Sequence, residues 1–381
     1  MKRLISIFAL SLVIISCSKN LIFKDTLINQ NEYDQFGNIP QRNFYYPISI
    51  SDSLQEIWQS SGYGSNTNTS ITIYADILFS PELAGNVVGF NLDNGKELGA
   101  RKSSGQISHS AVVDRMRIIY CVNQIKENYG ILYFYDFIKG EIINSIRING
   151  GISNELIKLK DGIIAVTDFG EVIKYNFLGS ELWNTKTKAI TLSDPASDKN
   201  DTFIANSNGE IISIDNETGK INFRKDFNSV FESGIIIKDK KLFLGNNEGI
   251  LFCLNSENGD IIWSFDSNNK IVMTPILDDR NIYFGNLNGD FYSINYSSGK
   301  INWQFNSGGL FNASGLVFNN LIIQPDLNKK LLIINKQDGK IIRSKNYNEK
   351  VKMSPVFYDN KIYVGVDRGE IVAYKLEIIN D

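Results

Sequence analysis

The chain has 381 residues, with 39 Lys and Arg against 42 Asp and Glu and a formal net charge of −3 at pH 7. This slightly acidic balance offers no basic surface of the kind that binds nucleic acid. The single histidine, His109, cannot form a metal cluster of its own, and its place before the apolar residues 111–113 predicts a role in a surface loop.

Lys2 and Arg3 follow the initial Met1 and precede an apolar stretch of about a dozen residues that ends in Ile14-Ile15-Ser16-Cys17. This is the pattern of an export signal, which is too short for a comfortable membrane span. Its last four residues resemble the lipobox of bacterial lipoproteins, which implies that residues 1–16 are removed and that Cys17 is acylated. A plain secretory signal and an uncleaved anchor are the alternatives. In proteobacterial lipoproteins an Asp after the cysteine favours the inner membrane, and Ser18 here points to the outer membrane, facing the periplasm.

Residues 17–53 have no place in the repeat described below and are rich in Asn, Gln and aromatic residues. We predict that this segment is an acylated tether. Its aromatic residues Phe44, Tyr45 and Tyr46 are expected to pack either on the repeat region of the same chain or on a partner. Because Cys17 carries lipid in this interpretation and the other two cysteines lie three repeats apart, Cys121 and Cys253 are expected to be buried thiols in strands.

From residue 54 onward the sequence repeats with a period of about 40 residues. Its clearest copies run from Gly209 to Phe223, from Gly249 to Trp263 and from Gly289 to Trp303. The same register extends in both directions and gives eight units, with anchor positions at residues 85, 130, 170, 209, 249, 289, 329 and 369.

Each unit is predicted to consist of strands. An apolar run ends in a polar pair before the first glycine, and an Asp/Asn/Ser-rich tetrad before the second glycine predicts a hairpin turn with positive φ. Between the glycines the apolar positions are too continuous for a sheet wetted on one face, as in Leu251, Phe252 and Leu254. Four-stranded antiparallel sheets that repeat in this way predict an all-β, eight-bladed β-propeller over residues 54–381.

The two ends of the repeat region each lack part of a unit. Residues 53–58 match the end of a repeat that has no beginning, whereas the unit that starts at Gly369 stops before its own outer strand. We therefore predict that residues 53–59 pair with residues 370–375 and close the ring without a free sheet edge. Tryptophans at one repeat position are expected to pack between blades, namely Trp58, Trp183, Trp263 and Trp303.

The repeated pattern Gly-x-apolar-x-x-apolar-Asp/Asn-x-x-x-Gly-Lys/Asp-x-x-Trp, preceded by Ser/Thr-Pro, resembles the PQQ-like repeat. With the lipobox and eight units, the whole mature chain resembles the BamB family, the lipoprotein subunits of the outer-membrane β-barrel assembly (BAM) machinery. Some units depart from the pattern, which should weaken blade packing locally without altering the count. Lys329 replaces the first glycine of the seventh unit, and the tryptophan position is held by Gly99, Asn144, Phe223 and Arg343.

This resemblance implies a protein partner. BamB proteins contact the periplasmic POTRA region of BamA through loops that carry a Leu-x-Leu-Arg run before a Ser-x-Pro strand start. Residues 187–195 keep the Ser-x-Pro but lack the arginine and the leucine pair. By position, Lys188, Ile190 and Leu192 are expected to dock on a BamA-like partner, and a solvated connecting loop is the alternative. The chain is expected to be monomeric within a hetero-complex.

The resemblance to PQQ-like repeats also raises the possibility of an enzyme. Quinoprotein dehydrogenases share the repeat, but they are larger, use calcium with a catalytic Asp and commonly carry adjacent cysteines, which this chain lacks. The turn from Asp215 to Gly219 does not have EF-hand spacing, and no nucleophile elbow, P-loop or zinc helix motif is present. We expect no catalytic residue, metal or cofactor. The alternatives are a periplasmic ligand- or protein-binding propeller of unknown target and a PQQ-dependent oxidoreductase.

Cys17→Ala should release the protein from membranes. Acyl chains on Cys17 would bury many CH₂ groups at about 0.8 kcal/mol each, whereas the mature chain offers no apolar span of its own. Fractionation of cells that express the variant measures this. Recovery of Cys17→Ala still firmly in the outer-membrane fraction would contradict the prediction.

Overall fold

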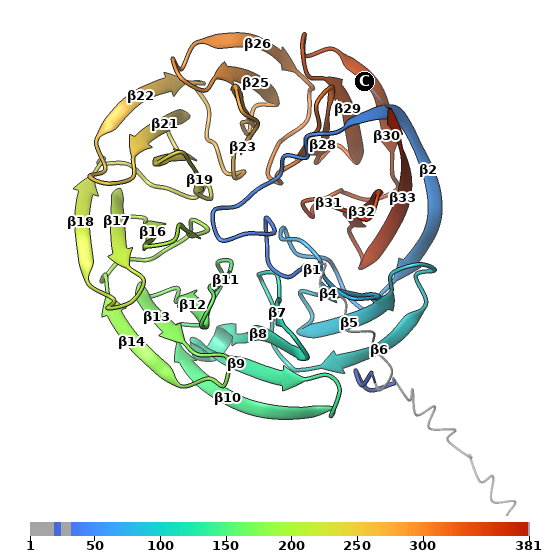
Figure 1. The fold of residues 1–381 in the computed structure, drawn as a ribbon, viewed down its shortest axis with the longest axis vertical. Coiled ribbons are helices and arrows are strands. Elements are labelled where there is room, and N and C mark those ends of the chain that lie inside the picture. Colours follow the sequence, from blue (N-terminus) through green and yellow to red (C-terminus); the bar gives the residue numbers. More distant parts are fainter. Residues whose placement is uncertain (1–18, 24–31, 380–381) are drawn as a thin grey trace, which may run out of the picture.

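The computed structural model describes residues 19–23 and 32–379 and places them in eight antiparallel sheets around a central axis (Figure 1). Cys17 lies outside the described residues. The predicted eight-bladed, all-β propeller is confirmed. Each blade runs from a short innermost strand at the axis to an outermost strand on the rim, and we number the blades 1 to 8 from the sheet that contains β3.

Strands near the axis are short because the blades converge there. The first strands of the blades are β3 (Thr72–Tyr74), β7 (Val112–Asp114), β11 (Ile157–Lys158), β15 (Ala196–Ser197), β19 (Ile236–Lys238), β23 (Ile276–Leu277), β27 (Leu316–Val317) and β31 (Val356–Tyr358). In blade 1, β1 (Glu32–Tyr33) pairs with β3 and adds a fifth strand at the inner edge. The second strands are β4 (Ile77–Pro81), β8 (Arg117–Gln124), β12 (Ile163–Val166), β16 (Asp201–Ala205), β20 (Lys241–Gly245), β24 (Asn281–Gly285), β28 (Leu321–Asp326) and β32 (Lys361–Val366).

The third strands carry the apolar triplets and are covered on both faces, as the sequence predicts. They are β5 (Asn86–Asn91), β9 (Tyr129–Asp136), β13 (Glu171–Tyr175), β17 (Glu210–Asp215), β21 (Ile250–Asn255), β25 (Asp290–Asn295), β29 (Lys330–Asn335) and β33 (Glu370–Ile379). The rim consists of β6 (Glu97–Lys102), β10 (Glu141–Asn149), β14 (Glu181–Lys186), β18 (Ile221–Asp226), β22 (Ile261–Asp266), β26 (Ile301–Asn306), β30 (Ile341–Asn346) and β2 (Ser49–Ser61). The 3-10 helix η1 (Ile125–Glu127) joins β8 to β9.

Strand β2 closes the ring by pairing with β33, so that the start of the repeat region completes the last blade (Figure 1). Gln59 lies opposite Val372 and Trp58 opposite Ala373, which confirms the predicted closure. The pairing is longer than predicted, because it continues to Ser49 opposite Ile379.

A closed belt of hydrogen bonds links the starts of the blades around the axis. Ser233 is typical, since its Oγ donates to the Met273 carbonyl at 2.8 Å in the next blade. All eight boundaries are bridged in this way, by Thr69 with Ser110, Ser110 with Glu155, Glu155 with Asp194, Ser193 with Ser233, Ser233 with Met273, Thr274 with Ser314, Ser314 with Ser354, and Ser354 with Thr69. Loss of one such buried bond would leave an unpaired donor or acceptor, at a cost of about 1–3 kcal/mol.

On the rim, a tryptophan of one blade covers a turn glycine of the next. Trp58 Nε1 donates to the Leu92 carbonyl at 3.1 Å, and the indole ring lies on Gly95, where a Cβ would collide with it. Gly95 also has a φ of 69°, so both its backbone conformation and the contact with the Trp58 ring require glycine at this position. The same contact joins Trp183 to Gly219, Trp263 to Gly299 and Trp303 to Gly339.

Two blades that lack the tryptophan make the same contact with the next blade through another side chain. Asn144 Nδ2 donates to the Leu178 carbonyl at 3.0 Å, and the ring of Phe223 lies on Gly259. Blade 1 has Gly99 instead, and the segment of residues 19–23 lies there, with the Ala100 amide donating to the Lys19 carbonyl at 2.9 Å. Ile22 of that segment rests on Gly140, where the missing tryptophan would stand.

The segment between β1 (Glu32–Tyr33) and β2 crosses the axis of the ring (Figure 1). It packs on its own propeller, which is one of the two interpretations of its aromatic residues: Phe44 is buried, and the ring of Tyr46 lies 4.7 Å from that of Phe357. Backbone amides of four blades donate to its carbonyls, Val113 to Asp34, Ser197 to Pro40, Ile237 to Gln41 and Val317 to Phe44.

Arg42 of this segment is fully buried at the axis beside two carboxyl groups of the belt. Its guanidinium donates to the carbonyls of Phe36 at 2.7 Å and Pro195 at 2.9 Å. Glu155 accepts hydrogen bonds from the Ser110 amide at 2.9 Å and hydroxyl at 3.1 Å. Burial raises the pKa of Glu155 to about 8, and the neighbouring Asp194 carboxyl adds to this rise.

His109 is buried, so the predicted surface-loop role is wrong. Its Nε2 accepts a hydrogen bond from the Cys121 amide at 3.1 Å, which leaves Nδ1 to donate to the Ser110 carbonyl at 2.7 Å. Burial lowers the pKa of His109 to about 4, and the neutral ring ties the residues before β7 to β8. Cys121 and Cys253 are buried free thiols in β8 and β21, as predicted.

Trp58→Ala should destabilise the protein by about 3 to 5 kcal/mol, because it removes a buried ring from the closing contact between blades 8 and 1. Chemical denaturation measures the change. The neighbouring Ile57 is 40% exposed, and Ile57→Ala is the matched control, with an effect of about 0.5 kcal/mol or less. A truncation that starts at residue 62 and melts like the parent would contradict the role of β2 in closure.

Stability should fall as the pH rises from about 5 to about 8, because the native state keeps a proton on Glu155 that the unfolded chain releases near pH 4.5. One proton gives a slope of up to about 1.4 kcal/mol per pH unit. Glu155→Gln cannot titrate and should flatten this slope, whereas Glu217→Gln in an exposed turn should preserve it. Denaturation at several pH values measures both, and parallel curves for parent and Glu155→Gln would refute this origin of the slope.

Candidate functional site

The connections between strands lie on two opposite faces, because neighbouring strands of a blade run in opposite directions. Links between blades share one face with the turns from second to third strands, and we name it the loop face. Turns from first to second and from third to fourth strands form the turn face. Asp34 and Gln35 contact Lys158 at the end of β11, which places the segment that crosses the axis on the turn face.

The residues predicted to bind a partner lie together on the loop face, in the link between β14 and β15. Their neighbours, such as Thr191, are buried, whereas Ile190 is 53% and Leu192 46% exposed, and Lys188 is also exposed. Hydrogen bonds to both adjoining blades hold the link in place. Asn154 donates to the Thr191 carbonyl at 2.9 Å, and the Ser207 amide donates to the Ile190 carbonyl at 2.9 Å.

Sequence reasoning missed Phe169, which belongs to the same surface. It is 48% exposed in the turn between β12 and β13, and Gly170 beside it lies against the Ala189 backbone. The residue before the first glycine is polar in blades 4 to 7, so an aromatic ring at this position was the available signal. Ile125 in η1 is also exposed on this face. We call Phe169, Lys188, Ile190 and Leu192 the loop-face patch.

The predicted blade-packing residues have a different environment. Trp58 and Trp183 are buried, and Trp263 and Trp303 are partly buried between blades. Among residues 19–23 and 32–379, no three His, Cys, Asp or Glu side chains are grouped so that they could hold a metal ion. In the same part of the chain, no helix has the length and apolar character needed to span a membrane.

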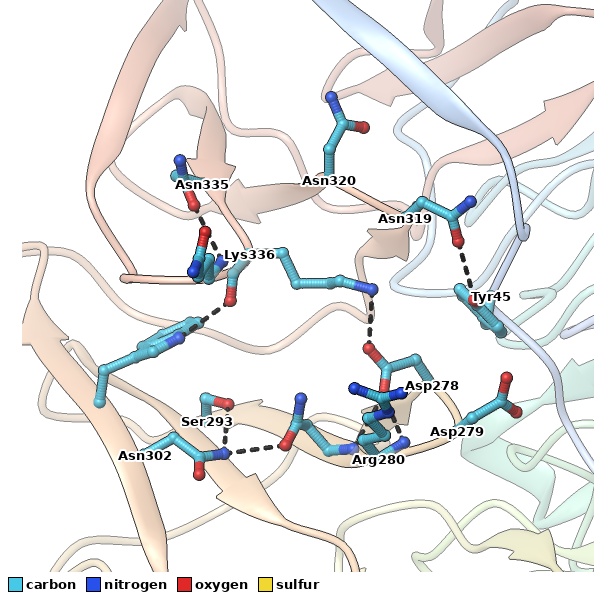
Figure 2. A pocket seen from close by; sticks show the side chains of 13 residues that line it. Tyr45, Asp278, Asp279, Arg280, Ser293, Asn302, Asn319, Asn320, Asn335 and Lys336 are labelled. Atoms are coloured by element: carbon cyan, nitrogen blue, oxygen red, sulfur yellow. Dashed lines mark hydrogen bonds and ion pairs between the residues drawn. The ribbon is translucent and has the colours of Figure 1, made fainter. Parts of the chain in front are cut away.

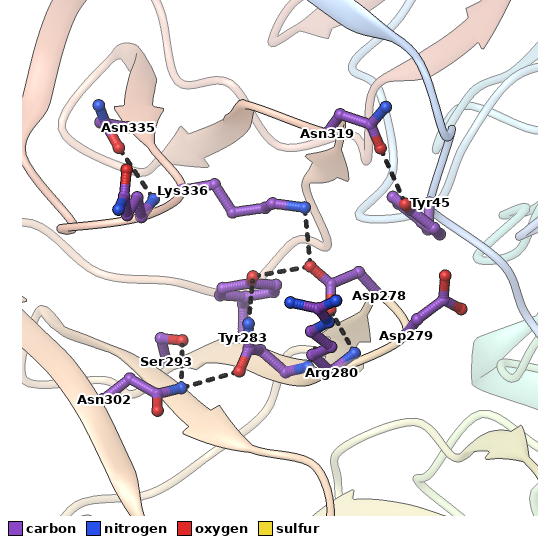
Figure 3. Close-up of polar contacts among 12 residues, drawn as sticks. Tyr45, Asp278, Asp279, Arg280, Tyr283, Ser293, Asn302, Asn319, Asn335 and Lys336 are labelled. Atoms are coloured by element: carbon purple, nitrogen blue, oxygen red, sulfur yellow. Dashed lines mark hydrogen bonds and ion pairs between the residues drawn. The ribbon is translucent and has the colours of Figure 1, made fainter.

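A cleft of about 710 Å³ opens on the turn face between blades 6 and 7 (Figure 2). Nothing in the sequence pattern indicated it. Lys336 extends across it to Asp278, with 2.9 Å between Nζ and Oδ2, and Tyr283 donates to the same carboxyl group at 2.9 Å (Figure 3). Its other walls carry amide, hydroxyl and aromatic side chains.

Comparison with solved structures shows which folds are similar. BamB from Moraxella catarrhalis matches with a TM-score of 0.72 and 16% identity, over 85% of this chain and 100% of that one. The computationally designed Ika8 protein matches with a TM-score of 0.74 and 13% identity, over 84% and 99% of the two chains. The quinohemoprotein alcohol dehydrogenase ADHIIG from Pseudomonas putida HK5 matches with a TM-score of 0.77 and 10% identity, over 92% and 81%. At these identities the likeness concerns the fold alone.

Comparison at the level of sequence identifies the family. No curated protein matches the chain significantly. A family model described as outer membrane protein assembly factor BamB matches residues 130–229 and 208–377, which together make up more than half of the chain. The repeat pattern, the eight closed blades and this match agree, and the chain belongs to the BamB family of PQQ-like repeat propellers.

Proposed function

We propose that the protein is a non-catalytic, periplasmic scaffold subunit of outer-membrane β-barrel protein assembly, which docks on the POTRA region of a BamA-like partner. Membership in the BamB family supports the assembly role. The observation that carries the docking proposal is the loop-face patch, where three large apolar side chains and a lysine are exposed. Phe169 lies in the turn between β12 and β13, and the other three lie on the link before β15, which both adjoining blades hold in place. Rigid scaffolds commonly present their binding residues on such loops.

We further propose that acyl chains on Cys17 hold this scaffold at the periplasmic face of the outer membrane. Lys19, two residues later in the chain, bonds to Ala100 on the rim of blade 1. Two residues span about 7 Å at most, so this rim would stay next to the lipid. The hydrogen bonds of residues 19–23 would thus limit how the ring tilts relative to the membrane.

The oxidoreductase alternative is disfavoured by the geometry at the axis. The segment that crosses the axis on the turn face uses its own Arg42 to occupy the space beside Glu155 and Asp194. The likeness to quinohemoprotein dehydrogenases concerns the fold alone. An absorbance spectrum taken after addition of quinone cofactor and calcium tests this alternative directly, and a cofactor spectrum that stays with the protein through gel filtration would favour it.

Ile190→Glu and Leu192→Glu should each weaken capture of a purified BamA-like POTRA fragment by about 1 kcal/mol or more, because a carboxylate would be desolvated at the centre of the contact. Phe169→Glu should do the same. Biolayer interferometry measures the affinity, and thermal melting should be unchanged because these side chains are exposed.

The matched control is Ile261→Glu on the rim of blade 5. Ile261 is 54% exposed, which is close to the 53% of Ile190, but it lies away from the loop-face patch. Capture should be unaffected by this change. If charged substitutions across the loop-face patch and at Ile125 leave capture intact, the docking proposal is wrong, and cross-linking with mass spectrometry on the intact complex would locate the interface.

A further inference from the structure

One position of the repeat is occupied differently at the boundary of blades 6 and 7 and at the boundary of blades 5 and 6. At the boundary of blades 5 and 6 this position is Tyr296, whose buried ring packs 5.3 Å from that of Phe243 and fills the groove. Forty residues later the same position is Lys336. A thin aliphatic stem replaces a ring, and about 710 Å³ of space remains, which is within the size range of small-molecule sites.

A second difference changes which side chains line the space. At the boundary of blades 3 and 4, Lys174 of β13 extends into the corresponding groove and contacts Asp161 at 2.8 Å and the Asn216 carbonyl at 2.9 Å. The equivalent residue of blade 6 is Ser293, whose side chain is too short to enter the space. The groove between blades 3 and 4 also stays open, with a volume of about 680 Å³, so Lys174 lines that groove and does not fill it. The two grooves differ in chemistry, because eight of the 14 residues that line the groove between blades 3 and 4 are charged, against four of 13 between blades 6 and 7.

Lys336 is a fixed part of the wall (Figure 3). Its ammonium group contacts Asp278, which is almost fully buried, and lies 5.4 Å from the centre of the Tyr45 ring. Burial acts to raise the pKa of Asp278, but hydrogen bonds from Lys336 and from the amides of Arg280 and Asn281 outweigh it, so the pKa lies below its ordinary value. The Asp278 carboxylate is therefore ionised near neutral pH, where it holds the Lys336 side chain in place.

The other walls offer both donors and acceptors (Figure 2). Asn302 Nδ2 donates to Asn281 Oδ1 at 2.9 Å and to Ser293 Oγ at 3.1 Å, while Asn319 Oδ1 accepts from Tyr45 at 2.9 Å. Within the part of the chain that the structure describes, these bonds leave Asn302 Oδ1 and Asn319 Nδ2 without a protein partner. The Arg280 guanidinium has no ion pair among the same residues.

Unpaired hydrogen-bond donors and acceptors that lie together in one cleft are suited to hydroxyl groups, each of which both donates and accepts a hydrogen bond. The charged side chains of the lining are two carboxylates, Asp278 and Asp279, and two cations, Arg280 and Lys336, so the lining has no net charge. Tyr45 and Trp303 add apolar aromatic surface, which the C–H faces of a sugar ring can cover. Six of the lining side chains are amides, namely Asn281, Asn302, Asn319, Asn320, Asn335 and Gln337.

We propose that the cleft between blades 6 and 7 is a binding site for a short saccharide. The free amide groups of Asn302 and Asn319 and the Arg280 guanidinium bind its hydroxyl or carboxylate oxygens, and the Lys336–Asp278 pair forms the base of the site. This inference does not depend on the scaffold role, because the cleft lies on the turn face, opposite the loop-face patch.

Isothermal titration calorimetry of the full-length protein with tri-N-acetylglucosamine and with trigalacturonate tests the proposal. Binding of either probe is the expected result, and a preference between them shows whether Arg280 meets a carboxylate. Arg280→Ala removes an exposed side chain and should weaken binding about tenfold without a change in melting temperature. The double variant Lys336→Tyr with Asp278→Lys recreates the closed groove between blades 5 and 6, where Lys238 and Tyr296 stand, and should abolish binding.

Lys240→Ala is the matched control, because Lys240 occupies the position of Arg280 in blade 5 beside the groove that Tyr296 fills. It should bind both probes like the parent. Two results would overturn the proposal. One is no heat of binding with either probe at concentrations up to about 10 mM. The other is unchanged affinity in both Arg280→Ala and the closed-groove variant, which would place the bound sugar elsewhere.

Discussion

The belt of hydrogen bonds around the axis is the constraint on which the remaining structure depends. Each blade is a small sheet that cannot bury both of its faces alone, so its stability comes from its two neighbours. The belt bonds the start of every blade to the next, and the ring therefore closes only when the eighth blade meets the first. Strand β2 makes the same closure on the rim. Two independent closures, one inside and one outside, fix the number of blades and suppress relative motion between them.

The rim contacts show how a repeat tolerates substitution. What the packing requires is a glycine in the turn and a group that covers it, and that group can be an indole, a phenyl ring or an amide. At Gly140 the covering group comes from outside the repeat, because Ile22 of the N-terminal segment takes the place of the missing tryptophan. A defect in one blade has thereby become an attachment point for the segment that follows Cys17. Departures from the consensus therefore mark where this chain has added something of its own.

The two faces of the ring differ in chemistry for a physical reason. Links on the loop face are long and cross between blades, so they can display apolar side chains such as Ile190 on a fixed backbone. Turns on the turn face are short and polar, and the grooves between them are filled to different degrees. Tyr296 fills the groove between blades 5 and 6, whereas about 680 Å³ remains between blades 3 and 4 and about 710 Å³ between blades 6 and 7. A protein partner suits the first surface and a small polar ligand suits a groove left open in the second. A rigid ring can carry both without coupling them, because neither site requires the blades to move.

The sequence alone determined the strand pattern, the period of the repeat, the number of blades and the pairing that closes the ring, because these depend on local periodicity and on residues at fixed spacing. It also indicated which link between blades is distinctive. Only the tertiary structure showed that Gly170, next to Phe169 in the chain, lies against the Ala189 backbone, that the segment before β2 crosses the axis, and that His109 is buried. The volume of the groove at Lys336 likewise became apparent only in the structure. Each of these features depends on which side chains of neighbouring blades meet across a boundary, and a pattern that repeats along one chain does not specify the space left between two of its copies.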